Sequence, residues 1–215
     1  MTSNKEEYLR VIYERGGESA HVANKVIAEE LGVAPSSVTE MLTKLKKDGL
    51  VEITPYKGAM LTEEGMLASL AVIRYHRLWE VFLVEKLGYT WREAHEEAHL
   101  LEHASTTRLI ERLDCFLGNP KTCPHGSLIP KDNAMGKELK LVPLSQLRKG
   151  QQGFIRRVSE DADLMDYLQR IGVVLNGEIE ILEVSDYEGP IAFRQESDRI
   201  NMSFKAAHDV FVETN

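Results

Sequence analysis

The chain has 215 residues, 43% hydrophobic and 28% charged, with a formal net charge of −8. Such values are typical of a globular protein with a buried core, and the negative charge argues against nucleic acid as a default partner, because polyanion binding needs clustered lysine and arginine. The longest apolar run is far shorter than a membrane span and the segment MTSNKEEYLR lacks an apolar signal region, so we expect no membrane association and a cytoplasmic location.

The first part of the chain has the element order of a winged helix-turn-helix. Apolar spacing predicts a first helix through Tyr13, a second over 24–31 and, after the short connection GVAP, a third over 36–47. The next stretch, LVEITPYKGAMLT, alternates apolar and polar residues around the turn at 55–58, which predicts a β-hairpin. This order indicates a DNA-binding domain over residues 1–64.

The third expected helix would enter the major groove of DNA. Short polar side chains at its start could contact base edges, namely those of Ser36, Ser37, Thr39 and Glu40. Phosphates would be contacted by Lys44, Lys46 and Lys47 and by the wing residues Tyr56 and Lys57. The competing interpretation is that Ser37 and Glu40 form a helix capping box and the lysines only solvate a surface. Residues 1–64 carry eight Lys/Arg against eleven Asp/Glu, a net charge of −3, so DNA binding would need something to offset the carboxylates.

Two long helices are expected next, between residues 65 and 120. One begins near Leu67 and ends at Gly88, and the other carries the stretch HEEAHLLEH early and runs to about Leu117. Their large apolar surface suggests a dimerisation layer. A Pro- and Gly-bearing linker over 118–138 follows, so we expect a helical dimerisation domain with its linker over 65–140.

The last part, residues 141–215, changes to β-type composition. The stretches FIRRV, EIEILEV, PIAF and INMSF predict strands, and Asp161 to Ile171 predicts a short helix. A small SH3-like β-barrel fits this pattern. The whole chain is therefore expected to be mainly α with a small β domain.

The stretch HEEAHLLEH, residues 95–103, fits two zinc peptidase patterns at once, H-E-x-x-H and the inverted H-x-x-E-H. Five of the seven histidines lie between His76 and His125, which is a concentration of metal ligands. Spacing alone leaves a peptidase with Glu96 as base, another metal site and a solvated helix face as alternatives. A peptidase would also need a substrate groove and a use for the winged domain, and no such arrangement is evident.

Helical spacing lets several side chains converge on one cation. His99, Glu102 and His103 share a helix face, as do His76 and Glu80 at positions i and i+4, and Glu7 on the first helix could complete a cage. The stretch Cys123-Pro124-His125 adds a thiolate and an imidazole. Mixed nitrogen and oxygen ligands with at most one sulfur suit Mn²⁺, Fe²⁺ or Zn²⁺.

Five stretches taken together resemble the diphtheria-toxin-repressor family of metal-dependent regulators: NKEEYLRVIYE, SVTEMLTKLKKDGLV, RYHRLWEVFLVEKLGY, HEEAHLLEH and CPHG. The resemblance covers nearly the whole chain in the right order and is closest to the three-domain manganese-responsive branch. It implies that LSQLRKGQQGFIRRVSEDADL belongs to an SH3-like (FeoA-like) C-terminal domain. It also implies that both peptidase patterns are coincidental and that the chain is not an enzyme.

The resemblance implies two metal sites per subunit. One would consist of Glu7, His76, His99, Glu102 and His103, and the other of Glu80, Cys123, His125 and Glu160. His95 matches a position that is a ligand in some members. The branch typically has Asp where Glu7 and Glu160 stand and a carboxylate where His99 stands. The metal that the site containing His99 prefers is therefore left open by the sequence.

The sequence therefore predicts a homodimeric repressor that is activated by a divalent metal, with Mn²⁺ favoured over Fe²⁺ and Zn²⁺. We expect it to bind a palindromic DNA operator and, from the resemblance, to control genes of metal uptake and homeostasis. The alternatives are a zinc metallopeptidase that uses HEEAH and a metal-buffering protein that does not bind DNA.

Overall fold

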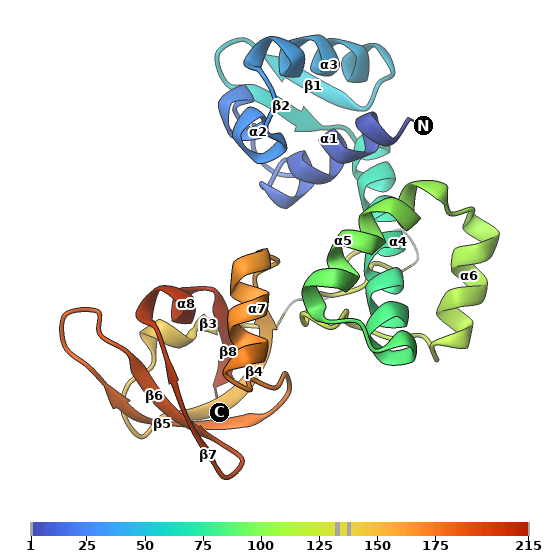
Figure 1. The fold of residues 1–215 in the computed structure, drawn as a ribbon. Helices are drawn as coiled ribbons and strands as arrows, with labels where there is room; N and C mark the ends of the chain where they lie inside the picture. The colour runs from blue at the N-terminus through green and yellow to red at the C-terminus, as the bar shows by residue number, and fades with distance from the viewer. Residues whose placement is uncertain (1, 132–133, 137–138, 215) are drawn as a thin grey trace. The chain divides into compact units, whose positions relative to one another are not determined.

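The structure is a computed structural model that describes residues 2–131, 134–136 and 139–214 (Figure 1). Residues 132–133 and 137–138, which belong to the predicted linker, lie outside the described residues. The chain divides into two compact units, the first formed by Met1–His76, His99–Ile110 and Pro130–Met135 and the second by Arg77–Ala98, Glu111–Ile129 and Gly136–Asn215. Nowhere in the described ranges is a helix long and apolar enough to cross a membrane.

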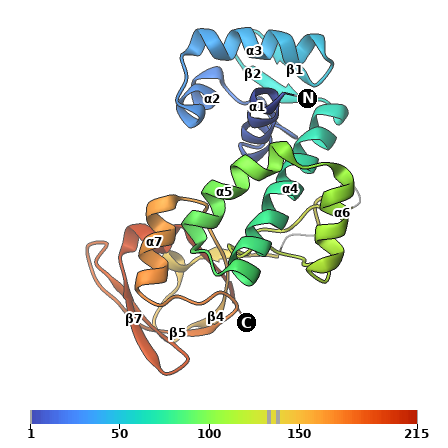
Figure 2. The same cartoon turned by 45° about the vertical axis from the view of Figure 1, so that its right-hand side comes forward.

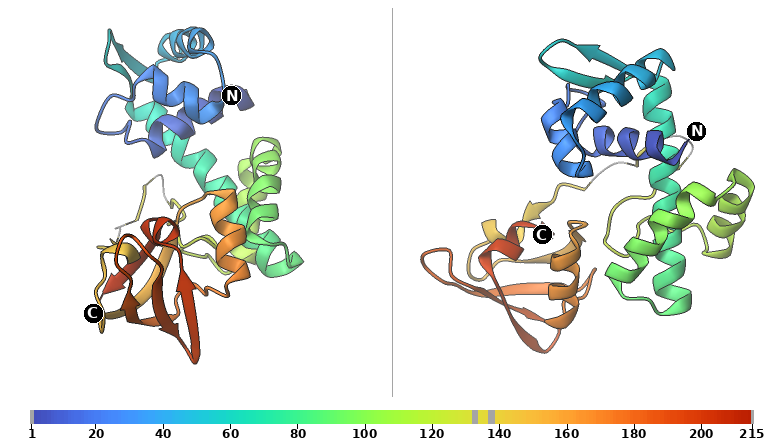
Figure 3. Two further views of the ribbon diagram at one scale, coloured as in Figure 1. Left: turned by 60° about the vertical axis from the view of Figure 1, so that its left-hand side comes forward. Right: turned by 45° about the horizontal axis from the view of Figure 1, so that its top comes forward.

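The first unit contains the predicted winged helix-turn-helix. Its elements are α1 (Ser3–Glu14), α2 (Asn24–Leu31), α3 (Pro35–Lys47), β1 (Val51–Thr54) and β2 (Gly58–Leu61). The three helices and the hairpin share one core, in which Leu9, Ile27 and Leu42 are fully buried at about 2 kcal/mol each. The hairpin runs beside α3 (Figure 3). Val22 pairs with Ala59 of β2, and Gly58 is required beside it because a Cβ would lie 2.0 Å from the Val22 carbonyl oxygen.

Three helices follow the wing: α4 (Glu63–Leu87), α5 (Trp91–Ala104) and α6 (Thr107–Phe116). Gly88 ends α4 in the left-handed region, as predicted. The prediction of one helix from HEEAHLLEH to Leu117 is wrong, because the chain breaks after Ala104. The Ser105 hydroxyl donates back to the Leu101 carbonyl oxygen, and Thr106 Oγ1 accepts from the Leu109 amide, so one helix ends and a new one begins.

The second unit holds a six-stranded antiparallel sheet in the order β3-β8-β4-β5-β6-β7. The strands are β3 (Val142–Pro143), β4 (Gln152–Val158), β5 (Glu178–Val184), β6 (Ile191–Gln195), β7 (Asp198–Met202) and β8 (Val210–Thr214). Register shifts in β4 and β5 bend the sheet. Helix α7 (Ala162–Arg170) begins at the N-cap Asp161 and packs on the sheet through Leu164 and Leu168 (Figure 2). A 3-10 helix (Leu144–Gln146) and α8 (Phe204–His208) complete the domain.

These elements confirm the predicted fold class, a mainly α chain with a small β domain. The four predicted strands correspond to β4 to β7, and the predicted helix to α7. Strands β3 and β8 were not predicted. They matter to the topology because β8 pairs with both β3 and β4.

Candidate metal centres

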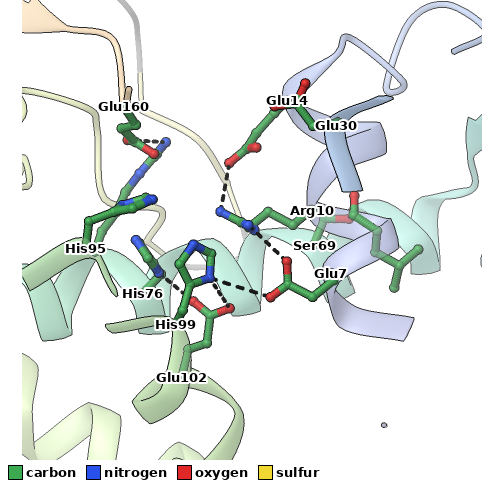
Figure 4. A network of polar contacts seen from close by, with 12 residues as sticks. Glu7, Arg10, Glu14, Glu30, Ser69, His76, His95, His99, Glu102 and Glu160 are labelled. Atoms are coloured by element: carbon green, nitrogen blue, oxygen red, sulfur yellow. Dashed lines mark hydrogen bonds and ion pairs between the residues drawn. The ribbon is translucent and has the colours of Figure 1, made fainter. Parts of the chain in front are cut away.

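The first unit brings together all five side chains predicted for one metal site, here called the first cluster: Glu7 of α1, His76 of α4, and His99, Glu102 and His103 of α5. Figure 4 shows the first four of them, Glu7, His76, His99 and Glu102. Glu102 lies between the imidazoles, with Oε2 2.7 Å from His76 Nδ1 and Oε1 3.3 Å from His103 Nε2. Glu7 Oε1 lies 2.9 Å from His103 Nε2 and 3.6 Å from His99 Nδ1. The i, i+3 and i+4 spacing places the three α5 residues on one helix face.

The electrostatics of the first cluster favour charged groups. Burial alone would raise the pKa of Glu7, but the hydrogen bond with His99 and the charge of Arg10 hold it below its usual range. Burial likewise opposes ionisation of Glu102, yet its contacts with His76 and His99 lower its pKa. The pKa of His99 rises despite burial, because Glu102 and Glu7 accept hydrogen bonds from it. His99 and the carboxylates of Glu7 and Glu102 therefore stabilise each other's charged forms.

Two further residues of α1 hold ligands of the first cluster from outside. Glu6 Oε2 lies 2.6 Å from His103 Nδ1, which leaves Nε2 of that ring to face Glu7 and Glu102. Arg10 donates from Nη2 to Glu7 Oε2 at 2.9 Å (Figure 4). Neither contact was predicted from the sequence. The contact of Arg10 with Glu7 was predictable, since the two residues are three positions apart on a helix. The contact between Glu6 and His103 spans 97 residues, and no local sequence pattern indicates it.

The second unit brings together Glu80 of α4 with Cys123 and His125 of the turn after α6, here called the second cluster. Their ligand atoms lie within 4.8 Å of one another, and all three side chains are buried. His125 Nδ1 is 3.4 Å from Glu80 Oε1 and 3.7 Å from Cys123 Sγ. His95 adjoins the cluster, with Nδ1 2.9 Å from Glu80 Oε1. The contact between His95 and Glu80 was not predicted.

The turn that carries Cys123 and His125 is fixed by its backbone. Cys123 donates its amide to the Ser127 carbonyl oxygen and accepts from the Gly126 amide, both at 2.9 Å. The His125 carbonyl oxygen accepts from the Val158 amide of β4 at 2.9 Å. Two hydrogen bonds within the turn and one to the β domain therefore position this pair of predicted ligands.

Glu160, the fourth residue predicted for this site, forms an ion pair with Arg77 at 3.7 Å. Its charge still reaches Cys123. Burial raises the pKa of the Cys123 thiol, and the charges of Glu80 and Glu160 raise it further. Burial opposes protonation of His125, but Glu80 and Cys123 raise its pKa to about 11. The structure thus brings three of the four predicted residues into one group and pairs the fourth with an arginine.

Both clusters have the donors that a divalent cation needs. Within the described ranges, His125 Nε2 is buried without a hydrogen-bond partner, although this atom can ligate a metal once it has lost its proton. A buried polar atom without a partner normally destabilises a fold. Mixed carboxylate and imidazole ligands, with one thiol in the second cluster, suit Mn²⁺, Fe²⁺ or Zn²⁺. The residues therefore fit a divalent metal.

The predicted DNA-contacting residues are all exposed on the winged domain: Ser36, Ser37, Thr39, Glu40, Lys44, Lys46 and Lys47 on α3, and Tyr56 and Lys57 on the wing. Glu40 pairs with Lys44 at 2.7 Å. The alternative capping box is not formed, since α3 begins after Ala34 without a side-chain cap. Tyr56 projects from the tip of the wing, fully exposed and at φ +64. This face is accessible to a DNA duplex.

Three family sequence models match the chain in order. The iron dependent repressor N-terminal DNA binding domain matches residues 1–59, the iron dependent repressor metal binding and dimerisation domain matches residues 62–131, and the FeoA domain matches residues 142–214. The iron-dependent repressor IdeR of Mycobacterium leprae is 30% identical over 99% of this chain and 98% of its own length. The chain belongs to the diphtheria-toxin-repressor family.

Solved structures of the diphtheria-toxin-repressor family superpose closely on this chain. A manganese-dependent transcriptional repressor in complex with manganese is 34% identical, covers 98% of this chain and 100% of its own, and has a TM-score of 0.87. ScaR with bound Cd²⁺ is 36% identical, covers 99% and 100%, and has a TM-score of 0.82. Because members of this family are transcriptional repressors, the two peptidase patterns in HEEAHLLEH are coincidental, and the prediction that the chain is not an enzyme is confirmed.

Proposed function

We propose that this member of the family is a manganese-responsive repressor that binds a palindromic operator as a homodimer and controls genes of metal uptake. One observation carries the proposal. The first cluster takes Glu7 from a helix of the DNA-binding domain and its other four ligands from α4 and α5. A ligand set divided in this way couples the metal to the placement of the DNA-reading helices.

The proposal includes a three-domain division at 1–64, 65–140 and 141–215 and two metal sites per subunit. The matched family models, which end at residue 59, span 62–131 and begin at residue 142, support these boundaries. Glu7, His76, His99, Glu102 and His103 would hold one ion. Glu80, Cys123 and His125 would hold the other, with Glu160 joining if it leaves Arg77.

The side chains of the first unit give the mechanism. A bound cation would supply two positive charges to a segment whose own net charge is −3, which favours contact with phosphates. Glu7 draws α1 toward α5 through His99 and His103. Ser69 of α4 adds a buried hydrogen bond to the Leu9 carbonyl oxygen of α1 at 3.1 Å. Fixing α1 in this way fixes the orientation of the winged domain, and in a dimer it sets the distance between two recognition helices.

Manganese is favoured among the possible metals by the relatives rather than by the ligands alone. The structure with a TM-score of 0.87 is a manganese-dependent repressor with manganese. ScaR is described as a manganese-activated repressor and was solved with Cd²⁺ and with Zn²⁺. Carboxylates suit Mn²⁺, whereas three imidazoles in one cluster favour Fe²⁺ and Zn²⁺. His99 is therefore the residue on which the assignment depends most.

Fluorescence anisotropy of the full chain tests the function. Duplexes would be selected from a randomised pool in Mn²⁺ and then titrated in Mn²⁺, anaerobic Fe²⁺, Zn²⁺ or chelator. We expect tight binding only with metal, with an affinity that falls steeply as salt is raised, because phosphate contacts release counterions. Equal affinity in Mn²⁺ and in chelator would refute metal activation.

Matched variants separate the two binding activities. Lys44→Ala and Tyr56→Ala should weaken DNA binding and leave the metal stoichiometry unchanged, since both side chains are exposed on the winged domain. Glu102→Gln should instead lower the metal stoichiometry by removing a buried ligand, and should weaken DNA binding as a consequence. Metal binding without selection of any duplex would instead support a metal-buffering protein.

A further inference from the structure

Arg10 places a permanent positive charge against a ligand of the first cluster. We propose that this guanidinium lowers the affinity of the first cluster for every divalent cation and so sets the metal concentration at which the cluster fills, without choosing between metals. The inference rests on the proposed function, because it assigns a role to a residue beside one of the proposed metal sites.

The contacts of Arg10 show that its charge is held in place. Its side chain is only 12% exposed, and Nη2 donates to Glu7 Oε2 at 2.9 Å while Nη1 lies 3.8 Å from Glu14 Oε1 (Figure 4). Burial alone would lower the pKa of Arg10, but the charges of Glu14, Glu7 and Glu102 raise it. The group therefore stays charged at any pH at which the protein is folded.

The charge of Arg10 lies close to the place where a metal would bind. Its guanidinium donates to Glu7 Oε2 at 2.9 Å, and the other oxygen of the same carboxylate faces His103 and His99. A fixed positive charge beside this carboxylate disfavours a cation bound to it, because both are positive. The penalty scales with the charge of the ion, which is two for a divalent cation.

Arg10 also orients Glu7, and this second effect by itself would raise the affinity for metal. It holds Oε2, so that Oε1 faces His103 and His99. Those two histidines hold Oε1 independently, and Glu7 would keep its direction without the arginine. The electrostatic effect therefore dominates, and removal of the charge should tighten metal binding.

Replacing Arg10 should not change the preference of the first cluster between Mn²⁺ and Zn²⁺. Coulomb repulsion depends on the charge of the ion, which is the same for Mn²⁺ and Zn²⁺, whereas ligand type distinguishes between them. Arg10 would then control the metal concentration at which the first cluster fills, and His99 would control the preference between metals. These two roles are separable by experiment.

The test is a Mn²⁺ titration of the full chain, read as the electron paramagnetic resonance signal of free Mn²⁺, in a Cys123→Ala background that silences the second cluster. Arg10→Met should bind Mn²⁺ at the first cluster about tenfold or more tightly at low salt, with a smaller gain at high salt. Arg10→Lys should stay close to the parent, because it keeps the charge. Arg15→Met is the matched control, since Arg15 ends the same helix and pairs with Glu30.

Competition with Zn²⁺ completes the test, and the ratio of the two affinities should be the same in the parent and in Arg10→Met. An unchanged or weaker Mn²⁺ affinity in Arg10→Met, or a changed ratio, overturns the inference. Arg10→Gln is a second neutral variant that must give the same result, so poor folding of one variant leaves the test intact. Absence of any metal at the first cluster of the parent would instead overturn the proposed function.

Discussion

Replacing Gly126 by alanine should disable the second cluster without removing a ligand. Gly126 follows His125 at φ +84, and a Cβ there would lie 1.8 Å from the Arg156 carbonyl oxygen of β4. A comfortable contact between carbon and a carbonyl oxygen is about 3.3 Å, so the turn must move by roughly 1.5 Å. Metal ligands tolerate only about 0.2 Å. The neighbouring hydrogen bond from the Val158 amide to the His125 carbonyl oxygen would be lost as well.

The cost can be estimated from these contacts. A lost hydrogen bond costs about 1 kcal/mol, and a side chain in the left-handed region costs about 1 to 2 kcal/mol. These effects disfavour the turn geometry that holds the ligands by about 2 to 3 kcal/mol in total, so metal binding, which needs that geometry, weakens roughly 30- to 150-fold. Isothermal titration with Mn²⁺ should then give one tight equivalent per subunit in place of two.

A second glycine serves as a control that separates the steric clash at Gly126 from the strain of a left-handed backbone. Gly118 has φ +77, but nothing lies within 4 Å of the position its Cβ would take. Gly118→Ala should therefore lower the melting temperature in chelator and keep both metal equivalents. Two tight equivalents in Gly126→Ala, or the same loss in both variants, would refute the assignment of the turn as the holder of the second site.

Two further predictions concern ligand chemistry. His99→Glu should shift the preference of the first cluster toward Mn²⁺, because it replaces an imidazole by a hard oxygen ligand, and competition titrations that return identical Mn²⁺ to Zn²⁺ ratios would mean that His99 is not a ligand. Metal binding at the second cluster should release about two protons at pH 7, since the pKa of His125 is raised to about 11 and that of the Cys123 thiol is also raised, and both must lose their protons to bind. Affinity should consequently increase with pH above 7, and calorimetry in buffers of different ionisation enthalpy measures the release. An affinity that is the same at pH 7 and pH 8 would contradict this.

Most of the helices and strands, and the types of ligand, follow from local patterns in the sequence. Apolar periodicity and glycine stops placed the winged helix-turn-helix and the long helix after it, with Gly32 ending α2 and Gly88 ending α4. Helical spacing placed His99, Glu102 and His103 on one face. These features depend on residues a few positions apart, and the chain encodes them locally.

Contacts between distant segments could be decided only by the tertiary structure. Nothing in the sequence pairs Glu6 with His103 or Glu80 with His95, because a contact across many residues depends on how whole helices pack. The ion pair of Glu160 with Arg77 likewise depends on where the chain places two oppositely charged groups. The break between α5 and α6 was missed for a different reason. A serine or threonine can lie inside a continuous helix, or its hydroxyl can bond to the backbone where a helix ends or begins. Only the side-chain conformation in the structure shows which of the two occurs.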